Sequence, residues 1–131
     1  MSQIDDISYM EQALHLAEKG RYSTSPNPAV GCVIVKNQRV IGSGFHRRAG
    51  GPHAEIEAIN SATESCENAT AYITLEPCSH HGKTGPCCEA LIAHQFARVV
   101  YAVIDPNQDI AGKGDRMLRK AGMDVLGGVC S

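Results

Sequence analysis

Four side chains of this 131-residue sequence could together perform metal-assisted hydrolysis: His53, Glu55, Cys78 and Cys87. A catalytic zinc takes three protein ligands and leaves its fourth position to water, whose pKa then falls to about 7. Two thiolates and a neutral imidazole cancel the double positive charge of the metal. We therefore predict that His53, Cys78 and Cys87 hold Zn²⁺ and that the nearby Glu55 is the catalytic residue that moves protons.

The order of these residues resembles a known signature. Zinc nucleobase deaminases carry His-x-Glu followed by Pro-Cys-x-x-Cys. The first half is present here unaltered, but eight residues, Ser79 to Pro86, separate the two cysteines where the signature has two. The second thiol ligand is therefore expected to return to the metal by a longer loop.

Two other interpretations of the cysteines remain open from the sequence. A structural zinc would need a fourth protein ligand, which His80 or Cys88 could supply. Six cysteines in a short chain also fit a disulfide framework, although the apolar content already supports a hydrophobic core. For the cysteines outside the metal set we expect the role of small, buried or partly exposed hydrophobic side chains: Cys32, Cys66, Cys88 and Cys130.

Cys87 and Cys88 compete for one place in the metal set. Adjacent residues on a helix point about 100° apart, so both thiols can hardly reach one metal in good geometry. The Pro-Cys pairing selects Cys87 as the ligand.

Composition limits the size and the partners of the protein. A chain of 131 residues and 14.0 kDa with 43% hydrophobic residues is long enough for one packed domain and too short for two ordinary ones, so we expect residues 1–131 to form a single domain. A formal net charge of -2 gives no basic surface for nucleic acid, which favours a small-molecule substrate. Without a signal peptide or a membrane-spanning apolar stretch, we expect no membrane association and a cytoplasmic location.

Hydrophobic periodicity predicts alternating helices and strands. A hairpin is expected where two apolar runs flank a short turn at residues 36–38. The element order predicts an α/β fold, a three-layer α/β/α sandwich with a mixed five-stranded sheet. The expected helices span residues 7–19, 52–61, 86–95 and 112–120, and the expected strands span residues 30–35, 39–45, 71–75, 99–104 and 123–126.

These elements are expected to bring the four chemical groups together. His53 and Glu55 fall at a helix N-terminus, Cys78 follows a strand, and Cys87 falls in a first helical turn. Helix N-termini carry partial positive charge and lower thiol pKa values, which favours the thiolate that a metal binds. We therefore expect two helix starts and one strand end to meet at one edge of the sheet.

Longer stretches are similar to a known enzyme family. Residues 53–55, 74–84 (Thr-Leu-Glu-Pro-Cys-Ser-His-His-Gly-Lys-Thr) and 105–107 (Asp-Pro-Asn) resemble the deaminase domain of the bifunctional riboflavin-biosynthesis deaminase/reductase, a member of the cytidine-deaminase-like superfamily. The similarity extends through residues 27–31 and 111–114, and so covers practically the whole chain. It implies the cytidine-deaminase-like fold and hydrolysis of a cyclic amidine carbon–nitrogen bond.

The resemblance also implies a substrate and a set of site residues. The substrate is 2,5-diamino-6-(5-phosphoribosylamino)pyrimidin-4(3H)-one, deaminated at ring carbon C2 to the corresponding uracil and ammonia. His53, Cys78 and Cys87 match the zinc ligands, and Glu55 matches the proton shuttle. The positions that match substrate-recognition residues are Asn27, His46, His80, Lys83, Asp105 and Asn107.

Residue chemistry suggests how some of these positions would bind the substrate. Lys83 offers a compact cation and His80 a switchable donor, so their loop is the expected clamp for the ribose phosphate. The amide of Asn27 suits a pyrimidine edge because it both donates and accepts hydrogen bonds. Asp105 and Asn107 could bind the ring or the ribose, or merely cap a turn.

Two alternatives stay open at this point. One is a zinc deaminase for another nucleoside, nucleotide, free base or tRNA adenosine, and the other is a non-catalytic zinc module. Against the resemblance, the chain stops where a reductase domain would follow, so reduction is expected to belong to a separate domain or protein. We also expect a homo-oligomer.

Overall fold

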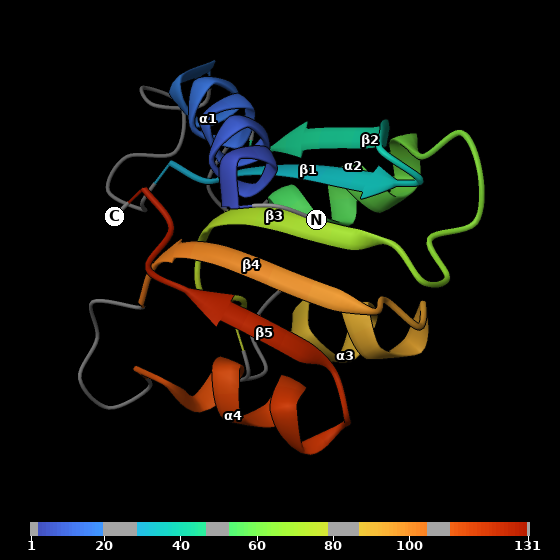
Figure 1. Cartoon of the computed structure of the whole chain (residues 1–131), viewed down its shortest axis with the longest axis vertical. Coiled ribbons are helices and arrows are strands. Elements are labelled where there is room, and N and C mark those ends of the chain that lie inside the picture. The colour runs from blue at the N-terminus through green and yellow to red at the C-terminus, as the bar shows by residue number, and fades with distance from the viewer. Residues whose placement is uncertain (1–2, 20–28, 47–52, 79–86, 105–110, 131) are drawn as a thin grey trace.

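The computed structural model describes residues 3–19, 29–46, 53–78, 87–104 and 111–130. The helices are α1 (Gln3–Lys19), α2 (Ala54–Ser61), α3 (Cys87–Ala93) and α4 (Lys113–Lys120). The strands are β1 (Gly31–Lys36), β2 (Arg39–Phe45), β3 (Thr70–Leu75), β4 (Arg98–Val103) and β5 (Asp124–Gly127). This is the predicted element order, and it confirms the predicted α/β class (Figure 1).

The ends of some elements differ from the prediction. α1 begins at Gln3 rather than at Ile7. His53 is the N-cap of α2, with φ -71° and ψ 164°, so it lies at the helix N-terminus as expected but outside the first turn. α3 ends before Gln95, whose left-handed φ of 59° is incompatible with a continuing helix.

A single mixed sheet joins the strands in the order β2-β1-β3-β4-β5. β1 is antiparallel to both β2 and β3, whereas β3, β4 and β5 run parallel. Asn37 and Gln38 link β1 to β2 with positive φ angles of 52° and 64°. Two successive left-handed residues suit the twist of a tight hairpin, which confirms the predicted pairing of these strands.

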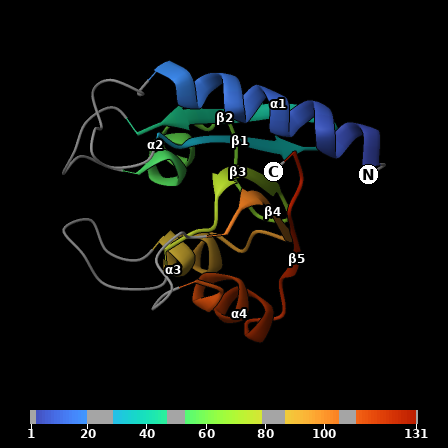
Figure 2. The same cartoon turned by 90° about the vertical axis from the view of Figure 1, so that its left-hand side faces the viewer.

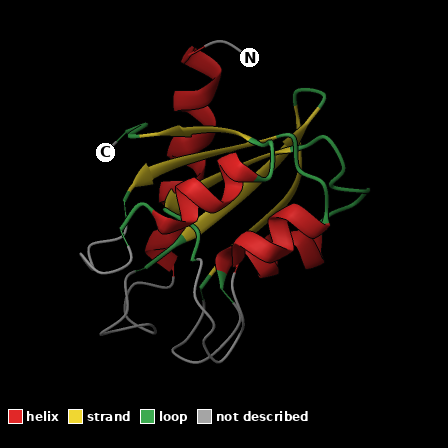
Figure 3. Cartoon of the chain, turned by 90° about the horizontal axis from the view of Figure 1, so that it is seen from below, coloured by secondary structure: helices red, strands yellow, loops and turns green. Residues whose placement is uncertain are grey.

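Helices cover both faces of the sheet, as the three-layer prediction requires (Figure 2). α1 packs one face through Met10 and Ala13 against Val33, Tyr72 and Val100. On the other face, α2, α3 and α4 enclose a larger apolar cluster with the sheet, and Figure 3 shows helices on either side of the strands. Among the described helices, none has both the length and the apolar character needed to cross a bilayer.

A glycine fixes how closely α2 approaches the sheet. A Cβ atom on Gly44 in β2 would lie 2.6 Å from the backbone nitrogen of Ala58 and 2.9 Å from the carbonyl oxygen of Ala54. Since real Cβ atoms do not approach backbone so closely, only glycine fits there. The first turn of α2 therefore rests directly on β2, and this turn carries Glu55.

A buried carboxylate ties α1 to the sheet. Asp6 accepts a hydrogen bond of 2.7 Å from the Tyr72 hydroxyl and a bidentate pair of 2.8 and 2.9 Å from the Arg98 guanidinium. The hydrogen bond from Arg98 lowers the pKa of Asp6 despite the opposing effect of burial. The carboxylate of Asp6 thus connects the first helix to β3 through Tyr72 and to β4 through Arg98, across more than 60 residues of sequence.

Replacing Asp6 by Asn is expected to lower the free energy of unfolding by about 2–3 kcal/mol, because it leaves the half-buried guanidinium of Arg98 and the buried hydroxyl of Tyr72 poorly matched. Since the pKa of Asp6 is lower in the folded state, its contribution is complete above its unfolded pKa of about 4 and is lost as pH falls through the folded value. Urea unfolding across this pH range measures both effects. The exposed Glu11→Gln on the same helix is the control. Equal acid sensitivity of wild type and Asp6→Asn would contradict the assignment.

Candidate metal centre and active site

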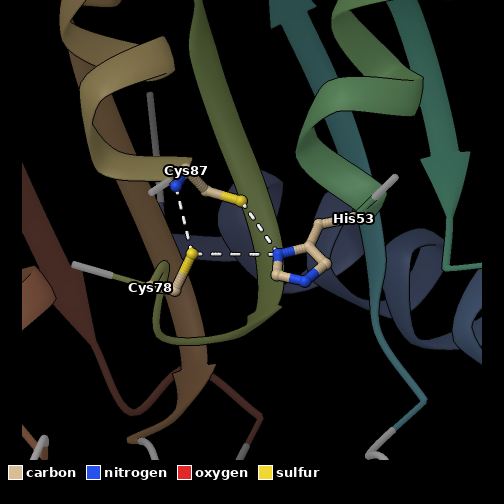
Figure 4. A group of neighbouring side chains, drawn as sticks. All are labelled: His53, Cys78 and Cys87. Atoms are coloured by element: carbon tan, nitrogen blue, oxygen red, sulfur yellow. Dashed lines mark hydrogen bonds between the residues drawn. The ribbon is translucent and has the colours of Figure 1, made fainter. Parts of the chain in front are cut away.

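Three potential metal ligands meet beyond the carboxyl end of β3 (Figure 4). His53 precedes α2, Cys78 follows β3, and Cys87 opens α3. Their ligand atoms all lie within 4.8 Å of one another. The predicted meeting of two helix starts and one strand end is therefore confirmed.

The distances within this group suit a tetrahedral metal. His53 Nδ1 lies 3.2 Å from Cys87 Sγ and 3.8 Å from Cys78 Sγ. Zinc bonds of about 2.1 Å to nitrogen and about 2.3 Å to sulfur, at the tetrahedral angle, separate the two ligand atoms by about 3.6 Å. The side chains thus lie around a space of the right size, and two thiols with one imidazole are donors that zinc prefers.

The start of α3 holds Cys78 in place. The backbone N–H of Cys87 donates to Cys78 Sγ at 3.1 Å, and that of Cys88 donates to the Cys78 carbonyl oxygen at 3.1 Å. Hydrogen bonding from Cys87 lowers the pKa of the Cys78 thiol to about 4. The same contact, with burial, raises the pKa of the Cys87 thiol. A cation between the sulfurs would remove the repulsion that keeps the second thiol protonated.

Glu55 lies beside the three candidate ligands but is not part of that group. It is the second residue of α2 and only 4% exposed. Burial raises the pKa of Glu55 to about 7, and its carboxyl interacts with the Cys87 thiol. A carboxyl group that exchanges its proton near neutral pH and adjoins a metal site has the properties of a general acid and base.

His46 is the one predicted substrate-recognition residue among those that the structure describes. Its ring is buried and lies edge-on to the His53 ring, with 5.3 Å between the centroids. Its backbone N–H donates to the Val30 carbonyl oxygen at 3.0 Å, which extends the hairpin pairing to the site. The other five predicted recognition residues lie outside the described residues: Asn27, His80, Lys83, Asp105 and Asn107.

The remaining cysteines behave as the sequence predicts. All six cysteines of the chain are free, so the disulfide interpretation is wrong. Cys88 is fully buried, and its thiol donates weakly to the carbonyl oxygens of Pro77 and Gly114 at 3.5 and 3.6 Å. It therefore points away from the metal group, into the core. Cys32 and Cys66 are also buried, and Cys130 is exposed.

Sequence reasoning assigned no role to Glu76, although the structure gives it a defined place. Its side chain is buried at 3% exposure and accepts hydrogen bonds from the backbone N–H groups of Gly112 at 3.0 Å and Asp115 at 2.9 Å. The sequence signal for such a role was the position of Glu76, two residues before Cys78 at the end of a predicted strand. Its partners are 36 and 39 residues away, and local patterns do not reveal them.

This mixed sheet, with His-Cys-Cys and a buried carboxyl at one edge, defines a zinc-binding deaminase. A family model described as the cytidine and deoxycytidylate deaminase zinc-binding region matches residues 3–103. The chain belongs to this family and, within it, to the riboflavin-biosynthesis pyrimidine deaminases.

Relatives of two lengths support this placement. The chain is 56% identical over 126 residues to riboflavin biosynthesis protein RibD of Escherichia coli, covering 96% of the chain and 34% of that protein. It is 51% identical over 128 residues to diaminohydroxyphosphoribosylamino-pyrimidine deaminase of Buchnera aphidicola, covering 98% of the chain and 87% of that protein.

A solved structure shares the fold. RibD of Acinetobacter baumannii superposes with a TM-score of 0.96 at 53% sequence identity, covering 98% of this chain and 36% of that one. The chain thus spans about a third of the length of the RibD proteins it matches and most of the length of the Buchnera deaminase.

Proposed function

We propose that the chain hydrolyses the C2 amino group of 2,5-diamino-6-(5-phosphoribosylamino)pyrimidin-4(3H)-one, releasing ammonia and the corresponding uracil. The observation that carries this proposal is the meeting of His53, Cys78 and Cys87 beside the buried carboxyl of Glu55. A relative of similar length bears the name of this deaminase, which supports the choice of substrate.

Zinc is the proposed metal, with His53, Cys78 and Cys87 as its ligands. His53 would bind through Nδ1, since this atom is the one that lies near both sulfurs. When bound, zinc acts as a Lewis acid that makes water a nucleophile near neutral pH. The Cys88 thiol points toward the carbonyl oxygens of Pro77 and Gly114, which supports Cys87 as the second thiolate ligand.

Glu55 is the proposed catalytic residue. Its carboxylate accepts the proton that the attacking water loses and delivers it to ring nitrogen N3. The carboxylate then takes the proton of the hydroxyl group now on C2 and passes it to the amino group, which leaves as ammonia while the C2 carbonyl of the uracil forms. Burial raises the pKa of Glu55, which supports a role in which one carboxyl acts first as base and then as acid.

The substrate contacts remain proposals from the resemblance. His46 is placed to line the site beside His53. We propose that Lys83 and His80 bind the ribose phosphate and that Asn27 binds the edge of the pyrimidine ring. For Asp105 and Asn107 we propose contacts with the ring or the ribose. The buried position of Glu55 favours an enzyme over a non-catalytic zinc module, in which this carboxyl would need no burial.

Purified protein is expected to contain zinc and to release ammonia from the diaminopyrimidinone phosphate. Ammonia release, measured by a coupled assay, should be at least about 100-fold slower with cytidine, deoxycytidylate or guanine, because none of them offers the same ring and phosphate groups together. Metal analysis of the same sample tests the cofactor. Faster deamination of any of the three control substrates would overturn the substrate assignment, and a zinc-free active protein would overturn the metal assignment.

Further proposals concern the setting of the enzyme. The folding of residues 1–131 as one domain and the homo-oligomeric state stay predictions, and light scattering would test the oligomeric state. We propose that the protein acts on a small molecule and has no nucleic-acid partner. Six free cysteines support a reducing compartment, and we propose the cytoplasm.

A further inference from the structure

Glu76 connects the metal-ligating segment to the last helix. Both of its carboxylate oxygens accept backbone hydrogen bonds at the start of α4, at 3.0 and 2.9 Å. We propose that Glu76 is a positioning residue: by holding the start of α4, it fixes Cys78 at the distance from His53 and Cys87 that the metal requires. This inference rests on the proposed function in taking Cys78 as a zinc ligand.

The start of α4 needs an acceptor from elsewhere in the chain. The first N–H groups of a helix have no partner within the helix, and an N-cap side chain usually serves one of them. Here the N-cap is Gly112, in the left-handed conformation with φ 83°, and no side-chain cap hydrogen bond is made at that position. Glu76 supplies the missing acceptor from the end of β3, with a negative charge that suits the helix dipole.

Cys78 is thereby held from two sides. Its thiol and carbonyl oxygen accept hydrogen bonds from the first turn of α3, and Glu76, two residues earlier, is anchored to α4. The intervening Pro77 is fully buried and has a fixed φ, so little freedom remains between the anchor and the ligand. Release of the Glu76 side chain would free this segment from α4, while the Glu76 backbone N–H would still donate to the Val103 carbonyl oxygen at 2.8 Å and the α3 contacts to Cys78 would remain.

A second contact joins the same two segments. A Cβ atom on Gly114 would lie 2.0 Å from the Pro77 carbonyl oxygen, so α4 touches the segment with no space for a side chain. The Cys88 thiol donates to the carbonyl oxygens of both Pro77 and Gly114. The position of α4 and the position of Cys78 are therefore coupled through two independent sets of contacts.

The test compares Glu76→Gln and Gly114→Ala with Asp6→Asn as the control. Glu76→Gln keeps the shape of the side chain but replaces one accepting carboxylate oxygen by an NH₂ group, which then faces a backbone N–H. Gly114→Ala adds a methyl group on α4 that would collide with the Pro77 carbonyl oxygen. Asp6 is an equally buried carboxylate that anchors α1 instead. All three are expected to lower the melting temperature of the zinc-free protein, so stability alone does not distinguish them.

Zinc affinity distinguishes positioning from general stabilisation. Competition with a chromophoric chelator is expected to show about 10–100-fold weaker zinc binding for Glu76→Gln and Gly114→Ala, the usual cost of losing an outer-shell partner, and wild-type binding for Asp6→Asn. The sulfur-to-cobalt absorption of the Co²⁺-substituted proteins should weaken in the same two variants. Should Glu76→Gln not accumulate as folded protein, Glu76→Asp, which keeps the charge but shortens the reach to the N–H groups of Gly112 and Asp115, decides by the same measurements.

Wild-type zinc affinity and an unchanged cobalt spectrum in the two test variants would overturn the positioning role, as would equal loss of affinity in Asp6→Asn. A wild-type chain that binds no zinc would overturn the proposed function itself. The two failures therefore give different results in the same experiment.

Discussion

Replacing Glu55 by Gln is expected to lower kcat for deamination by about 10²–10⁴-fold, the usual contribution of general acid–base catalysis, while zinc remains bound. Gln has the same shape as Glu but cannot accept and return a proton. The site should be preserved, because Glu55 is outside the group of three ligand side chains that lie close together. The measurement is steady-state ammonia release, with metal analysis of the same preparation.

The matched control is Glu57→Gln, on the same helix two residues further on. Glu57 is half-buried, whereas Glu55 is 4% exposed and lies against the Cys87 thiol. Only the Glu55 variant should lose turnover. Near-normal turnover in Glu55→Gln with zinc bound would show that another group moves the protons, and equal loss in both variants would point to a distorted α2.

Local sequence patterns were sufficient for the elements and for the metal group. Periodicity located the helices and strands, and the positions of His53, Cys78 and Cys87 at element ends predicted their convergence because those ends meet at one sheet edge. The hairpin followed from the short turn between two apolar runs. None of these inferences needed a contact between distant segments.

Contacts across long sequence separations could not be predicted in this way. The order β2-β1-β3-β4-β5, the edge-on packing of His46 on His53, and the anchoring of Glu76 to α4 depend on which surfaces meet after folding. Periodicity gives the face that a residue occupies and says nothing of its partner on another element. The extended backbone of His53 was missed for a similar reason, since a helix start is hard to place to the residue from sequence.

Replacing Cys87 by Ser is expected to abolish stable zinc binding and deamination, whereas Cys88→Ser should keep both. Loss of a direct ligand should weaken zinc binding by more than the about 10–100-fold that an outer-shell partner contributes. Cys87 Sγ lies 3.2 Å from His53 Nδ1, while the Cys88 thiol donates to Pro77 and Gly114. Zinc content after dialysis and ammonia release measure the two outcomes.

The pair forms a stringent test because the two thiols are neighbours in one helical turn and both are buried. Any general effect of a polar hydroxyl in this turn should appear in both variants. In Cys88→Ser the hydroxyl can still donate to the same carbonyl oxygens, so we expect a change in stability of no more than about 1 kcal/mol. Zinc retained in Cys87→Ser but lost in Cys88→Ser would reverse the ligand assignment. Zinc retained in both would mean that the metal binds elsewhere.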